Sequence, residues 1–210
     1  TVHVVKADPI KGNQGSPWDK DVQHPNIQVY SLPRRYPQIV SHPEGGILNK
    51  IKYKLAYNRL NKEAEGTIYD IAIGWEDDFL ARSKKLIQEK GITQVIATGA
   101  PFNLLYYTAK LKEDFEHLNI VVDYRDPWLN AVNYGMADLS QDRMAHETWK
   151  QDYLFSKVDT VVAPNEFLLE EIKETSKSQD FSCDFVSLPH FYDVDDLQAY
   201  LKEDRVLGKK

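Results

Sequence analysis

The sequence predicts an α/β fold in which parallel strands alternate with helices. Short runs rich in β-branched residues recur from residue 93 onward, at residues 93–98, 120–124, 159–163 and 184–188. Each run is long enough for one buried strand. Segments with helical spacing separate the runs, and turn residues mark the junctions. This alternation predicts a Rossmann-like parallel sheet with right-handed crossovers and helices on both faces.

Two more strands are expected near the amino terminus, at residues 1–6 and 26–31. The stretch between them, residues 8–24, holds Pro and Gly among polar residues and is expected to be a surface loop. Residues 70–75 are expected to form either a short strand or an extended approach to a helix.

The clearest expected helix lies at residues 78–90. Acidic residues surround its start, lysines occupy its last turns, and Gly91 follows as a C′ residue. The residues expected on its inner face are Phe79, Ser83, Leu86 and Ile87. Further helices are expected at 47–65, from Pro101 to about residue 117, from the Ser140 cap to about residue 157, at 166–175 after the Asn165 cap, and at 195–204.

Composition limits the class of protein. The chain has 210 residues and a net charge of −6, which suits one sizeable domain and is not typical of a nucleic-acid binder. We place that domain at residues 1–193 and a linker at 194–210. Cys183 is the one cysteine, so a reducing, cytoplasmic compartment is expected, with Cys183 inert and packed. The histidines show no metal-ligand spacing, and no apolar stretch reaches the ~20 residues of a spanning helix.

Residues 31–62 are strongly basic in an otherwise acidic chain. Glu44 is the one acid among seven Lys and Arg residues, so this stretch carries +6 and the remainder carries −12. A solvated helix face is one interpretation. The interleaved Ile, Leu and Tyr residues favour another, in which the stretch from Arg34 to Lys62 binds an anionic membrane surface or an acidic ligand.

Residues 120–128, Ile-Val-Val-Asp-Tyr-Arg-Asp-Pro-Trp, combine a buried strand with an abrupt polar end. Pro127 cannot donate to a ladder and biases Asp126 towards an extended or turn conformation. The strand should therefore end just before Arg125 and present Arg125, Asp126 and Trp128 past its carboxyl end. Ligands bind outside such ends in open α/β sheets, so the sequence predicts an active-site edge here.

A second candidate position is the turn at residues 98–102, Thr-Gly-Ala-Pro-Phe, which follows a strand and opens a helix. Free backbone N–H groups and the helix dipole make such a corner an anion site, although five residues alone are more simply interpreted as a bare turn. Neither a G-x-G-x-x-G fingerprint nor a Walker loop occurs, which disfavours a dinucleotide dehydrogenase or a P-loop enzyme.

Taken in order, several stretches resemble the acceptor domain of bacterial family 4 glycosyltransferases. They include Gly74-Trp75, residues 95–102 with the Thr-Gly-Ala-Pro-Phe turn, and residues 122–128 with Asp-Tyr-Arg-Asp-Pro-Trp. Residues 158–166 are similar to the family's next strand and turn, and residues 187–193 to its crossover into a second domain.

The chain departs from the family at a few positions. Ala100 replaces the first proline of the turn, and His190 and Phe191 stand where the family usually has Asn-Gly. Family members also have a strand and a Gly-rich loop ahead of the position of Thr1, and a second domain that holds the nucleotide-sugar. The resemblance therefore implies one half of a GT-B enzyme, lacking its first strand, that loop and the carboxyl-terminal domain.

The resemblance implies metal-independent transfer of a sugar from a nucleotide-sugar to an acceptor hydroxyl, with retention at the anomeric carbon. The acceptor would be a glycan or a lipid-linked sugar, used in polysaccharide or glycolipid biosynthesis at the inner face of the cell membrane. Asp126 would orient a sugar hydroxyl or accept its proton. Arg125 would pair with an acid, and Trp128 would stack on a sugar or pack in the core. The other candidates at this edge are Thr98, Gly99, Asn165 and Glu166, with helix capping as the alternative for the last two.

Two other classes of protein fit the same residues. One is a non-catalytic Rossmann-like module that binds a sugar or a partner, and the other is a GT-B-fold epimerase acting on a nucleotide-sugar. A second domain with two spaced glutamates would favour the transferase.

Overall fold

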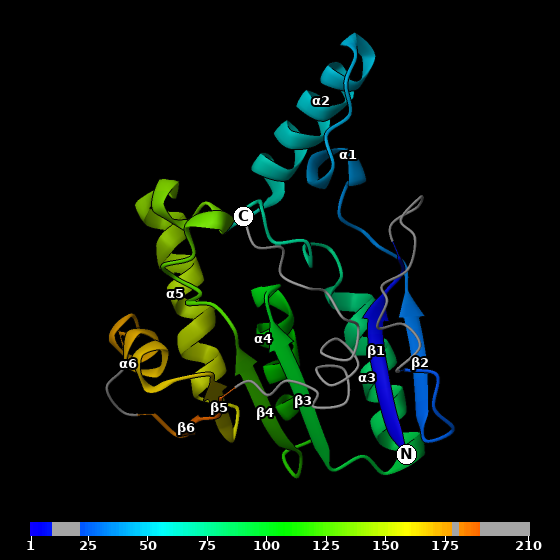
Figure 1. Ribbon diagram of the computed structural model, residues 1–210, viewed down its shortest axis with the longest axis vertical. Coiled ribbons are helices and arrows are strands. Elements are labelled where there is room, and N and C mark those ends of the chain that lie inside the picture. The colour runs from blue at the N-terminus through cyan, green and yellow to red at the C-terminus, as the bar shows by residue number, and fades with distance from the viewer. Residues whose placement is uncertain (10–21, 178–180, 190–210) are drawn as a thin grey trace, which may run out of the picture.

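All described strands are parallel and form two sheets in the computed structural model, which describes residues 1–9, 22–177 and 181–189 (Figure 1). One sheet pairs β1 (Val2–Ala7) with β2 (Ile27–Leu32). The other has the order β3 (Gln94–Gly99), β4 (Asn119–Tyr124), β5 (Thr160–Ala163) and β6 (Asp184–Ser187). The predicted α/β, Rossmann-like class with a helix-flanked parallel sheet is confirmed.

Helices occupy most of the segments between the described strands. They are α1 (Gln38–Ser41), α2 (Ile47–Glu63), α3 (Glu76–Lys90), α4 (Phe102–Ala109), α5 (Gln141–Phe155) and α6 (Glu166–Glu174). Short 3-10 turns lie at Lys110–Glu113, Val132–Tyr134 and Met136–Asp138.

Helix α3 confirms the prediction made from helical spacing. Its buried residues are the expected Phe79, Ser83, Leu86 and Ile87. It ends at Gly91, whose φ of 61° is left-handed and whose N–H bonds to the carbonyl of Ile87. Glycine adopts this conformation without steric cost, which explains why the helix ends here.

The expectation of a strand or extended approach at residues 70–75 was wrong. Residues 71–74 form turns, because the Asp70 carboxylate accepts a hydrogen bond from the N–H of Ala72 at 2.8 Å and Gly74 has a φ of 76°. Helix α4 with its 3-10 extension ends at Glu113, short of residue 117. The expected linker at 194–210, the helix at 195–204 and much of the loop at 8–24 lie outside the described residues.

The core lies beneath one face of the four-stranded sheet. Ile120, Val122 and Tyr124 alternate along β4, are fully buried, and share one cluster with residues of α4, α5 and α6. The opposite face carries Ile96 and Val186, which are 74% and 43% exposed. Helices therefore pack on one face of this sheet, whereas the opposite face leaves apolar side chains exposed.

The helical layer continues across the break between the two sheets. Leu32 of β2, Phe79 and Ile87 of α3, and Ala97 of β3 belong to the same core cluster. In Figure 1, β1 and β3 are the neighbouring edges of the two sheets, yet no ladder joins them. One layer of helices therefore supports a sheet that is interrupted between β1 and β3.

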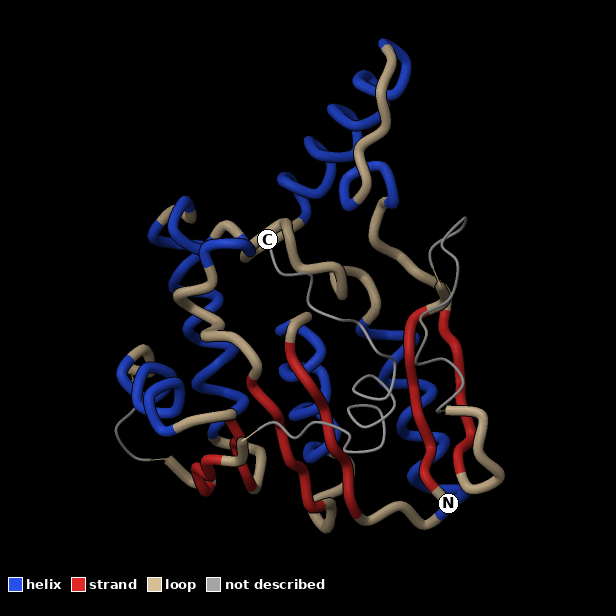
Figure 2. Tube along the Cα trace, viewed as in Figure 1, coloured by secondary structure: helices blue, strands red, loops and turns tan. Residues whose placement is uncertain are grey.

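Helix α2 projects away from this body (Figures 1 and 2). Its base is held by a second, smaller cluster formed by Tyr36, Val40, Leu60 and Ile68. The Tyr36 hydroxyl donates to the carbonyl of Ile68 at 2.8 Å, and burial raises the pKa of Tyr36 to about 12. No helix among the described residues is long and apolar enough to cross a membrane.

Candidate functional site

The carboxyl ends of β3, β4 and β5 meet at one edge of the sheet. Thr98 pairs with Asp123, which pairs with Val162, so these three residues form a row across neighbouring strands. Gly99 pairs with Tyr124 at the last position of each strand. The structure therefore brings the predicted turn at residues 98–102 and the predicted strand end together.

Arg125 and Asp126 follow this row as exposed residues. The Arg125 Nε lies 3.6 Å from a carboxylate oxygen of Asp123, which confirms that Arg125 pairs with an acid. The Arg125 side chain is 60% exposed, so this pair adds little to stability. Asp126 interacts electrostatically with Tyr134. Burial is the main cause that raises the pKa of Tyr134, and Asp70 and Asp126 raise it further.

Trp128 lies in the core instead of the cleft. Its ring is fully buried and stacks on Phe102 with a centroid distance of 5.4 Å and an interplanar angle of 8°. Its Nε1 donates to the carboxylate of Glu147 at 2.9 Å. The packed alternative for Trp128 therefore holds, and its ring has no open face for a sugar.

The corner that opens α4 is already occupied by a carboxyl group of the protein itself. The N–H of Asn103 donates at 2.8 Å to the carboxylate of Asp70, which is 1% exposed. Burial raises the pKa of Asp70, although the N–H groups of Asn103 and Ala72 and the charge of Lys150 act against this rise. The sequence left two interpretations of this turn, an anion site for a ligand and a bare turn, and the Asp70 carboxyl group occupies the position that such a ligand would take.

A buried charged network behind this corner escaped the sequence analysis. Glu147 accepts hydrogen bonds at 2.9 Å from the N–H of Thr67, from Lys150 Nζ and from Trp128 Nε1. Lys150 Nζ also donates to the Asn103 side chain at 2.7 Å. The buried carboxylate and ammonium groups are thus paired and hydrogen-bonded. The available signal was the inner face of α5, where Glu and Lys occupy positions i and i+3 ahead of Leu154.

Asn165 and Glu166 lie just past the carboxyl end of β5. Asn165 is the N-cap of α6, and its Oδ1 accepts from the N–H of Leu168 at 2.8 Å. Asn165 therefore caps a helix, which is the role that the sequence offered as the alternative to ligand binding. Both side chains are exposed and remain at the same edge as Asp126.

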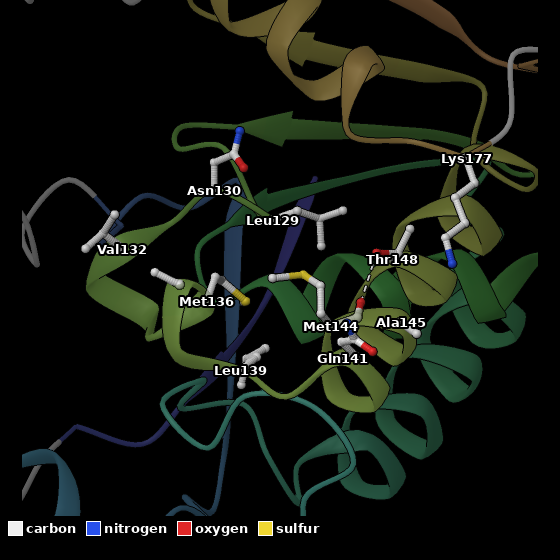
Figure 3. Close-up of a pocket in the computed structure, with 11 residues that line it drawn as sticks. Leu129, Asn130, Val132, Met136, Leu139, Gln141, Met144, Ala145, Thr148 and Lys177 are labelled. Carbon is white, nitrogen blue, oxygen red and sulfur yellow. Dashed lines mark hydrogen bonds between the residues drawn. The ribbon is translucent and has the colours of Figure 1, made fainter.

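A cavity of about 610 Å³ opens directly after this edge (Figure 3). Its walls are mostly apolar and come from the loop after β4 and the start of α5, including Leu129, Met136, Leu139 and Met144. Figure 3 shows Met136 and Met144 on facing walls and Lys177 at one end. The exposed Asp126 therefore lies three residues before the apolar lining that begins at Leu129.

A second cavity of about 450 Å³ lies past the carboxyl ends of β1 and β2. Its lining includes Asp8, Arg34, Tyr36 and His42. Arg34 donates to the backbone carbonyl of Asp8 across it. Within the described residues, no group of three or more His, Cys, Asp or Glu side chains could hold a metal ion.

Comparison of the chain with protein-family models, with curated proteins and with solved structures finds no match. The site is therefore interpreted from its own geometry and from the sequence motifs that surround it.

Proposed function

We propose that this chain is the acceptor-binding half of a retaining GT-B glycosyltransferase, acting in polysaccharide or glycolipid biosynthesis. The observation that carries the proposal is the exposed Asp126 at the carboxyl edge of the sheet, three residues before the lining of an apolar cavity of about 610 Å³. A carboxylate at a strand end is placed to orient a sugar hydroxyl. The cavity offers an apolar surface to the lipid or aglycone that carries that sugar.

The roles within the site follow from exposure and pairing. Asp126 orients the attacking hydroxyl of the acceptor or accepts its proton. Thr98 lies near the end of the neighbouring strand β3, Glu166 follows the end of β5, and Arg125 pairs with Asp123. Trp128 contributes indirectly, because its contacts with Phe102 and Glu147 fix the loop that follows Asp126.

The break in the sheet supports the same proposal. A parallel strand ahead of Thr1, as the resemblance implies, would fit between β1 and β3 and pair with both edges. The chain would move from that strand to β1 in one direction along the sheet, whereas it moves from β3 to β6 in the other direction. Because crossovers are right-handed, the helix between that strand and β1 would cover the face opposite to α4, α5 and α6. That is the face on which Ile96 is 74% exposed.

The donor would bind to a second domain, so this chain alone should not bind nucleotide-sugars tightly. The test is an NMR titration of the labelled chain with short alkyl glycosides and, separately, with a panel of nucleotide-sugars. We expect the glycosides to shift the amide signals of Thr98, Asp126 and Asn130, and the nucleotide-sugars to bind weakly or not at all. Tight binding of any nucleotide-sugar, or glycoside shifts confined to the cavity near Arg34, would contradict the proposal.

The same edge would serve a non-catalytic sugar-binding module. Glycoside binding without turnover in a complete polypeptide would favour that class of protein. Tight nucleotide-sugar binding to this chain, with inversion of a sugar centre, would favour an epimerase.

A further inference from the structure

Helix α2 exposes a line of large apolar side chains on the projecting part of the molecule. Ile47, Leu48, Ile51 and Leu55 are between 53% and 79% exposed. Their spacing of i, i+1, i+4 and i+8 places them on one side of the helix, within an arc of about 100°. We propose that this apolar stripe, Ile47, Leu48, Ile51 and Leu55, docks the domain on the surface of an anionic membrane.

The helix has a second apolar side that the protein itself uses. Leu60 is buried, and Tyr53, Ala56 and Tyr57 pack against the same small cluster as Tyr36. This side holds α2 on the domain. The apolar stripe is therefore not required for the attachment of the helix and faces away from the cluster.

Basic residues flank the apolar stripe on both sides. By helical spacing, Lys50 and Lys54 lie along one flank, and Lys52 and Arg59 along the other. Glu63 is the one acid in α2, and it lies at the carboxyl end in a 3.0 Å pair with Arg59. Lysine stems can extend along apolar surface while their ammonium groups reach lipid phosphates.

The charge pattern favours a membrane over a second copy of the chain. Two copies joined through the stripe would bring the lysine flanks of one helix against those of the other, which costs free energy. An anionic bilayer instead offers hydrocarbon to the stripe and negative headgroups to both flanks. We therefore commit to anionic phospholipid as the occupant.

The position of α2 relative to the sheet edge links membrane docking to the acceptor. This link rests on the proposed function, whereas the docking itself does not. In Figure 1 the strands of both sheets point towards the end of the molecule from which α2 projects. Docking through α2 would turn the carboxyl edge that carries Asp126 towards the membrane. A lipid-linked acceptor could then reach the site without leaving the bilayer.

The test is co-sedimentation of the chain with vesicles of phosphatidylcholine alone or with about one third phosphatidylglycerol. We expect binding to the anionic vesicles at low salt and its loss in high salt, because screening removes the lysine contribution. The double variant Lys50→Gln/Lys54→Gln should bind roughly 10- to 30-fold more weakly, since each basic residue near such a surface contributes ~1 kcal/mol. The matched control Lys85→Gln/Lys90→Gln removes two exposed lysines of α3 and should bind as the parent does.

The apolar contribution is tested in the same assay. Leu48→Ser/Leu55→Ser should lose at least tenfold in binding, whereas Phe167→Ser, which removes an 81% exposed side chain on α6, should not. Circular dichroism checks that the variants fold. Equal binding to neutral and anionic vesicles, no binding to either, or a stripe-dependent dimer in solution would overturn the proposal. Glycoside binding at the Asp126 edge is measured by NMR without vesicles. A failure of vesicle binding therefore does not affect the test of the proposed function.

Discussion

Glu147 connects four parts of the chain through one buried carboxylate. It accepts from the N–H of Thr67, from Trp128 in the loop after β4, and from Lys150 on its own helix, which in turn contacts Asn103 of α4. Removing one member of such a network leaves a buried charge without a partner, and this typically lowers stability by about 3–5 kcal/mol. We infer that this network fixes the loop on which Asp126 depends.

Gly66 is the residue whose replacement tests this network most directly. A Cβ atom at Gly66 would lie 1.7 Å from Glu147 Oε1, so Gly66→Ala must displace the carboxylate. We expect Gly66→Ala to lower the free energy of unfolding by at least about 3 kcal/mol. Urea unfolding measures this, with Gly45→Ala as the control, because no atom lies within 4 Å of a Cβ there. Equal stability of the two variants would show that the network tolerates displacement.

Asp70 predicts a pH dependence of stability. Its pKa is raised in the folded protein by burial, above the ordinary value of 3.8. The contribution of Asp70 to stability is therefore fully present below about pH 4 and is lost as the pH rises through the folded-state pKa. The difference in unfolding free energy between the parent and Asp70→Asn should shift against the parent as the pH rises from about 4 towards neutral. Unfolding curves across that range measure it, and a constant difference would exclude a raised pKa.

At the scale of elements, helix ends and strand runs could be predicted because their signals are local. The inner face of α3 follows from its spacing, and Gly91 and Asn165 mark helix ends by side-chain and backbone chemistry. Asp70 and Glu147 could not be assigned in the same way. Asp70 bonds to Asn103 and Glu147 to Thr67, which lie 33 and 80 residues away along the chain, and no local pattern indicates these two contacts.

The candidate site was predicted in outline for the same reason. Parallel strands place their carboxyl ends together, so Thr98, Asp126 and Asn165 could be grouped from the strand pattern alone. The burial of Trp128 and the occupation of the α4 corner by Asp70 could not, because both depend on tertiary packing. The chemistry assigned to Asp126 remains a prediction.

Helices α5 and α6 each begin at a residue whose side chain caps the helix, and the two caps differ in geometry. Asn165 Oδ1 accepts from Leu168 at 2.8 Å, whereas Ser140 Oγ accepts from Arg143 at 3.5 Å. We expect Asn165→Ala to lower the unfolding free energy by about 1 kcal/mol and Ser140→Ala by clearly less. Thermal unfolding measures both, and a larger loss for Ser140→Ala would contradict the assignment of cap strength from geometry.

At the scale of the whole molecule, three separate features lie towards one end of the fold. The carboxyl edge presents Asp126, the apolar cavity begins at Leu129, and α2 projects from the end towards which the strands point. The proposed transferase would use the carboxylate, the apolar cavity and the proposed membrane contact together to take a lipid-linked acceptor from the membrane. No ladder joins β1 to β3, and Ile96 on β3 is 74% exposed.

The most direct measurement of the central claim is sugar transfer by a polypeptide that includes the proposed nucleotide-sugar domain, before and after Asp126→Asn. This substitution keeps the shape of the side chain and removes its charge. We predict that turnover falls on the order of 10²-fold with an unchanged melting temperature, the scale of a positioned acid–base group. Asp123→Asn, whose carboxylate pairs with Arg125 within the fold, should act through stability if it acts at all. Near-normal turnover by a stable Asp126→Asn variant would contradict the catalytic assignment of Asp126.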